Sequence, residues 1–107
     1  MTPLTYEILL ALADAERHGY GIIKELESRF GADAAPSTAA LYLALRRMEQ
    51  DGLIAEAATR APDDDARRRY YRITRSGRAA ATAESARLAR LLKTARAKHL
   101  LPGRADA

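Results

Sequence analysis

The sequence predicts a mainly α-helical domain with one small β-hairpin. Alanine and leucine supply most of the apolar residues and valine is absent. This composition favours helices, because β-branched side chains are the ones that suit strands. Apolar residues recur at helical spacing in four segments, and only two short segments have the character of strands. A length of 107 residues fits one compact domain.

The first helix is expected over residues 3–15, where a capping threonine and a proline precede apolar residues at helical spacing. Residues 16–19 are predicted to form a turn. A second helix is expected over 20–30, with Gly31 as a suitable residue at its C-terminal end. We expect Tyr20 to lie in the core.

A third helix is expected after Pro36, with Ser37 as its N-cap and Asp51-Gly52 at its end. Leu41, Leu45 and Met48 follow at spacings of four and three, which predicts a buried stripe. The side chains expected to face outward are Thr38, Tyr42, Arg46 and Glu49.

The two strand-like segments are residues 53–57 and 69–74, and the polar residues 59–68 between them predict a hairpin with a long tip. Alternation places Tyr71 and Ile73 on the inner face. The side chains expected to face outward are Tyr70 and Arg72.

One long helix is expected from Arg75 to Leu100, a segment rich in alanine and leucine. The chain is therefore divided into a helical and hairpin domain at 1–76, a long C-terminal helix at 77–101, and a frayed tail at 102–107. Three helices followed by a hairpin describe a winged helix-turn-helix domain. In such a domain the third helix offers its outer face to the major groove of DNA and the hairpin is the wing.

Several motifs strengthen this interpretation. They are ILLAL at 8–12, HGY at 18–20, ALYLALRRME at 40–49, DGLI at 51–54, and RRYYRIT at 68–74 followed by Gly77-Arg78. Together they resemble the PadR family of bacterial transcriptional regulators over residues 4–78. The resemblance implies a winged-helix regulator of the repressor type.

The sequence departs from the family pattern at three places. Leu43 stands where proline usually follows the Leu-Tyr pair. The single C-terminal helix resembles the short branch of the family, in which that helix dimerises. Asp63, Asp64 and Asp65 lie at the expected wing tip, where they would repel phosphate, so we expect them to point away from DNA.

Arginine dominates the positive charge. The chain carries 18 Lys and Arg against 14 Asp and Glu, a net charge of +4, and arginines cluster between Arg60 and Arg78. A guanidinium group grips phosphate with two hydrogen bonds and can read guanine, so the cluster indicates a nucleic-acid partner. The alternative is an arginine-rich surface that is simply solvated.

Two groups of residues are predicted to contact DNA. The first turns of the third helix favour phosphate through free N–H groups and the helix dipole, and arginines near the hairpin tip favour the DNA backbone. The candidates are Ser37, Thr38, Ala39, Tyr42 and Arg46 on the helix, and Arg67, Arg68 and Arg69 on the hairpin. For Tyr42, a phosphate or sugar contact is what the PadR resemblance implies.

The alternative for these residues is a purely structural role without DNA contact. Ser37 would then be an ordinary N-cap, Tyr42 would pack on the wing, and the hairpin arginines would pair with the nearby aspartates. Arg47 lies to the side of the helix and is expected to pair with Glu49 or Glu27.

The long helix carries a narrow apolar stripe, which predicts a homodimer. Large apolar side chains are few in this chain, so a partner subunit would add stability. The residues expected at the dimer interface are Leu88, Leu91, Leu92, Ala95 and His99.

Several classes of function are disfavoured. The chain has no cysteine, and its only histidines, His18 and His99, lack the companions of a metal site. No nucleophile with a base and no glycine-rich phosphate loop is evident, so we expect neither an enzyme nor a cofactor. No apolar run is long enough for a membrane span and no signal peptide is visible, which favours the cytoplasm.

The sequence thus predicts a sequence-specific transcriptional regulator that binds double-stranded DNA as a homodimer, acts on an inverted-repeat operator, and answers to an unidentified small-molecule effector. The alternative is a winged-helix module that binds an acidic protein without sequence-specific DNA binding.

Overall fold

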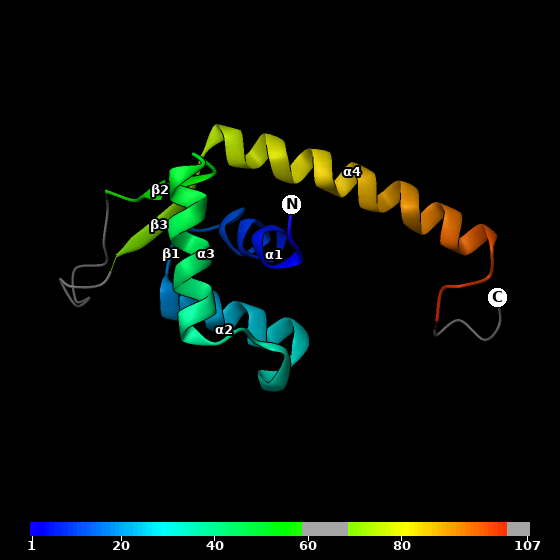
Figure 1. Ribbon diagram of the computed structural model, residues 1–107, viewed down its shortest axis with the longest axis horizontal. Coiled ribbons are helices and arrows are strands. Elements are labelled where there is room, and N and C mark those ends of the chain that lie inside the picture. Colours follow the sequence, from blue (N-terminus) through cyan, green and yellow to red (C-terminus); the bar gives the residue numbers. More distant parts are fainter. Residues whose placement is uncertain (59–68, 103–107) are drawn as a thin grey trace.

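The computed structural model describes residues 1–58 and 69–102, and it confirms the mainly helical fold with a small sheet (Figure 1). The elements are α1 (Pro3–Leu12), β1 (Arg17–His18), α2 (Gly19–Phe30), the 3-10 helix η1 (Ala32–Ala34), α3 (Thr38–Gln50), β2 (Ile54–Glu56), β3 (Tyr70–Ile73) and α4 (Arg75–Ala97). The first three helices pack beside the sheet, and α4 runs across α1 and continues beyond it (Figure 1). The predicted hairpin tip lies outside the described residues.

The sheet has three antiparallel strands, one more than the sequence predicted. Their order is β1-β3-β2, with Ile54 opposite Ile73 and Arg17 opposite Tyr71. Strand β1 lies where we expected only a turn. Two residues are too few to show the alternation of a strand, so this strand is defined only by its pairing with β3.

Helix α1 ends earlier than the expected position near Ala15. The Arg17 Nε donates to the carbonyl of Ala11 at 2.8 Å, and an Arg78 guanidinium nitrogen donates to the carbonyl of Ala13 at 2.9 Å. These donors satisfy carbonyl groups at the helix end that would otherwise lack partners. The end of α1 is therefore stabilised by side chains from β1 and α4.

The hydrophobic core lies between the first three helices and the inner face of the sheet. Its buried residues include Ile8, Leu9, Ala11 and Leu12 from α1, Ile22 and Leu26 from α2, Leu41, Leu45 and Met48 from α3, and Ile54 and Tyr71 from the sheet. The predicted stripe of the third helix and the inward position of Tyr71 are confirmed. Tyr20 is not in the core, because it points away from the side of α2 that carries Ile22.

The first turns of α4 are fixed to the rest of the domain. The Thr74 hydroxyl caps the helix by accepting from the Gly77 N–H at 3.0 Å, and it donates to the Gly52 carbonyl at 2.6 Å. Gly77 is buried, and a Cβ atom there would collide with the carbonyl oxygen of Leu53. Ala81, one turn further, packs against the core.

Helix α4 ends at Ala97, before the predicted end at Leu100. His99 has a φ angle of +61°, and its N–H bonds to the Arg96 carbonyl at 3.1 Å. The N–H of Leu100 bonds to the Ala95 carbonyl at 2.9 Å. These two bonds form a Schellman motif, which closes a helix. The expectation that His99 continues the helical stripe is therefore wrong.

Candidate nucleic-acid interface

The first turn of α3 presents short side chains to solvent. The Ser37 hydroxyl accepts from the Ala40 N–H at 3.1 Å, so Ser37 acts as the N-cap. Thr38 and Ala39 are exposed. The helix dipole is positive at this end, and small side chains allow a phosphate group or a base edge to approach the backbone.

The face of α3 opposite its buried stripe differs from the one predicted. The residues furthest around the helix from the stripe are Ala39, Leu43, Arg46 and Gln50, at spacings of four, three and four, and all are exposed. Glu49, expected to face outward, is partly buried. Leu43 and Gln50 are therefore candidate contact residues that the sequence analysis missed. Their spacing relative to Leu41 and Leu45 would have found them.

Tyr42 packs on the start of α2. A Cβ atom at Gly19 would collide with the Tyr42 hydroxyl oxygen, so only glycine allows this approach. The tyrosine nevertheless stays 45% exposed. Its hydroxyl group lies at the junction of α2 and α3, beside the buried Gly19.

Tyr20 lies in the first turn of α2 and is 55% exposed. Its ring is nearly parallel to that of His18, with 6.4 Å between centroids, and the Lys24 Nζ lies 5.2 Å from its centroid. A hydrogen bond with Tyr20, together with the nearby Glu27 carboxylate, raises the pKa of the Lys24 ammonium group. The exposed start of α2 thus carries a polar aromatic group and a positive charge.

Arg69 connects the hairpin to the end of α3. Its Nε lies 2.6 Å from a Glu56 carboxylate oxygen, and another guanidinium nitrogen lies 3.1 Å from Glu49. The hydrogen bond to Glu56 raises the pKa of the guanidinium group, while burial raises the pKa of Tyr71. Arg69 therefore pairs with glutamates, where the sequence analysis considered aspartates. Its predicted neighbours in DNA binding, residues 67–68, lie outside the described residues.

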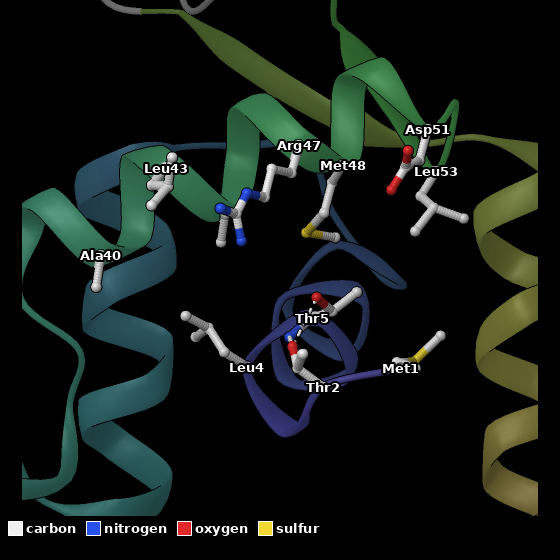
Figure 2. Close-up of a pocket in the computed structure, with 11 residues that line it drawn as sticks. Met1, Thr2, Leu4, Thr5, Ala40, Leu43, Arg47, Met48, Asp51 and Leu53 are labelled. Carbon is white, nitrogen blue, oxygen red and sulfur yellow. Dashed lines mark hydrogen bonds between the residues drawn. The ribbon is translucent and has the colours of Figure 1, made fainter.

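Arg47 points toward α1, into a groove of about 410 Å³ between α1 and α3 (Figure 2). The lining of this groove is largely apolar and includes Leu4 and Met48. In the described part of the chain, the carboxylates of Glu27 and Glu49 pair with other cations, Lys24 and Arg69. The expected pairing of Arg47 with one of these glutamates is therefore wrong.

The apolar residues Leu88, Leu91, Leu92 and Ala95, which we call the α4 stripe, lie on the second half of α4. Leu88 borders a groove of about 340 Å³ with Tyr6 and Leu10 of α1. Leu91 and Leu92 lie beyond α1 and are 53% and 52% exposed. The stripe thus continues past the core of its own protomer.

Together, α2, α3 and the β2–β3 hairpin form a winged helix-turn-helix unit with α3 as its recognition helix. This architecture defines a class of DNA-binding proteins. The described residues hold no cluster of three or more potential metal ligands. In the same part of the chain, no helix is long and apolar enough to cross a membrane.

Comparison with known proteins identifies the family. The model of the transcriptional regulator PadR-like family matches residues 8–83. The transcriptional regulator Rv3488 of Mycobacterium tuberculosis (strain ATCC 25618 / H37Rv) is 43% identical over 86 residues, which cover 80% of this chain and 76% of that protein. The chain belongs to the PadR-like family, and it is a DNA-binding transcriptional regulator rather than an enzyme.

Solved structures agree with this fold. A transcriptional regulator from Clostridium thermocellum, Cth-833, matches with a TM-score of 0.74 and 26% identity, over 92% of this chain and 90% of that one. Bacillus subtilis PadR in complex with operator DNA matches with a TM-score of 0.66 and 23% identity, over 77% of this chain and 46% of that one.

Proposed function

We propose that this PadR-family regulator is a homodimeric repressor that binds an inverted-repeat operator in double-stranded DNA. The observation that carries the proposal is the contrast between the faces of α3. Leu41, Leu45 and Met48 fix the helix to the core, while its opposite face is open to solvent. A rigid helix with one open face suits insertion into the major groove.

The proposed DNA contacts follow from this placement. Thr38 and Ala39 approach the DNA at the first turn of α3, and Tyr42 and Arg46 contact the backbone or the base edges. Ser37 contributes by orienting the start of the helix. The hairpin arginines, Arg67 to Arg69, add contacts to phosphate or to the minor groove. The fold shared with the Bacillus subtilis PadR that was crystallised with operator DNA supports this docking mode.

The α4 stripe supports the dimer. Burying Leu91 and Leu92 against a second copy would remove apolar surface from water, which is favourable. A two-fold axis through paired α4 helices would place two recognition helices about 34 Å apart, one turn of DNA. The operator would then be an inverted repeat. A small molecule that changes the dimer geometry would act as the effector, and the cytoplasm is where such a DNA-binding protein would work.

The experiment selects bound duplexes from a random DNA pool with the full-length protein. We expect an inverted repeat, two chains per duplex, and lower expression of a reporter placed behind that sequence. Arg46→Gln then tests the docking mode, because each lost phosphate contact reduces the log–log salt slope by about 0.9, which amounts to about 1.8 for the two protomers of a dimer. Arg47→Gln is the matched control, since this neighbouring arginine points toward α1.

Equal salt slopes for the two variants would contradict the assignment of the α3 face. Binding without sequence selection would contradict the regulator model itself and favour a module whose basic surface attracts polyanions.

A further inference from the structure

The outer face of α3 carries one large apolar side chain. Leu43 is 48% exposed, whereas Leu41 and Leu45 of the same helix are buried. It lies between Ala39 and Arg46 on the face opposite the core stripe. Leu43 thus lies on the surface that the proposed function inserts into the major groove, on the side of that surface nearest the groove between α1 and α3.

The fold covers Leu43 only in part. It lies at the edge of the groove between α1 and α3, and nearly half of its surface remains open to water (Figure 2). Burying the exposed surface of Leu43 against a ligand would be favourable, because it removes apolar area from water. The side chain has no hydrogen-bonding group, so its partner must also be apolar.

The major groove offers one prominent apolar group for such a contact, the C5 methyl of thymine. The polar neighbours on the same face, Arg46 and Gln50, have the functional groups that pair with guanine and adenine edges. An apolar side chain beside Arg46 on this face suits recognition of a methyl group.

We propose that Leu43 is a specificity-determining residue that contacts a thymine methyl group in each half of the operator. The inference rests on the proposed function, because it requires α3 to enter the major groove. It adds a defined base preference that phosphate contacts cannot supply. It also gives a role to a position at which this sequence departs from the PadR motif.

The test uses a duplex selected from a random pool by the full-length protein. Each thymine is replaced in turn by uracil, which keeps the base pair and removes only the methyl group. We expect one such replacement in each half-site to weaken binding about three- to fourfold, since a buried methylene-sized group contributes about 0.8 kcal/mol and a factor of ten corresponds to about 1.4 kcal/mol.

The variant Leu43→Ala connects this effect to the side chain. It should bind the thymine duplex about nine- to sixteenfold more weakly than the unchanged protein, because the contacts in both half-sites are lost, and it should bind the thymine and uracil duplexes equally. Leu100→Ala removes the same atoms from an exposed leucine beyond α4 and should preserve the discrimination. Melting temperatures of both variants within a degree or so of the unchanged protein would show that the folds are intact.

Two results would overturn the inference while leaving the proposed function in place. The first is selective DNA binding in which no thymine methyl matters, and the second is full discrimination by Leu43→Ala. Failure to select any sequence would instead overturn both the proposed function and the proposed role of Leu43.

Discussion

The two halves of α4 belong to one continuous helix, but they have different neighbours. In residues 75–86, Gly77 lies under the Leu53 carbonyl and Ala81 packs on the core. The Tyr6 hydroxyl also lies 2.6 Å from that of Ser85. In residues 87–97, the exposed leucines of the α4 stripe extend beyond α1.

This difference shows that helix formation and helix docking have separate causes. Alanine and leucine favour the helical backbone in both halves. Docking of the first half depends on small residues that allow close approach, whereas the second half offers large apolar side chains to another surface. The first half therefore belongs to the fold of the protomer, and the second half supports the proposed dimer.

Charge placed on the α4 stripe should have the strongest effect, because it acts on the proposed dimer. The double substitution Leu88→Asp with Leu92→Asp should abolish the dimer and reduce operator binding, because burying unpaired carboxylates costs several kcal/mol, about 2–7 kcal/mol even for an uncharged polar group. Sedimentation equilibrium at micromolar concentration measures the outcome. Aspartates at the exposed positions 86 and 93, on the opposite side of α4, form the control and should leave a dimer.

A dimer that survives the double substitution would refute this role of the stripe. An unchanged protein that is monomeric at the same concentration would refute the dimer itself.

A substitution in the first half should act on the protomer instead. Gly77→Ala should lower the free energy of unfolding by about 1–3 kcal/mol, because the new methyl group forces the helix away from Leu53. Chemical denaturation measures the change. Ala79→Gly, at an exposed position of the same half, should cost only about 1 kcal/mol through helix propensity. If Gly77→Ala has no larger effect than that control, the close packing is not required.

The smallest expected effect concerns the end of the second half. His99→Gly should stabilise the last turn of α4 by about 0.5–1 kcal/mol, because glycine adopts a positive φ angle without the steric cost of a Cβ atom. Amide hydrogen exchange at Leu100 should slow about two- to fivefold. Faster exchange would mean that the histidine side chain itself stabilises the turn.

The recognition helix shows how far local pattern predicts structure. Ser37 followed by Leu41, Leu45 and Met48 predicted both the N-cap and the buried stripe, and the structure confirms them. The outward face was predicted less well, although the exposure of Leu43 follows from its position on the helix opposite Leu41 and Leu45.

Composition, helical spacing and capping residues determined the four main helices, because helix formation depends on neighbours within a few positions along the chain. The order of the helices and strand-like segments then indicated the winged-helix class. The tertiary structure alone decided the strand at Arg17 and the pairing of Arg69 with two glutamates. These features join segments far apart in sequence. Their energies come from contacts that form only after the chain has folded, so no local pattern encodes them.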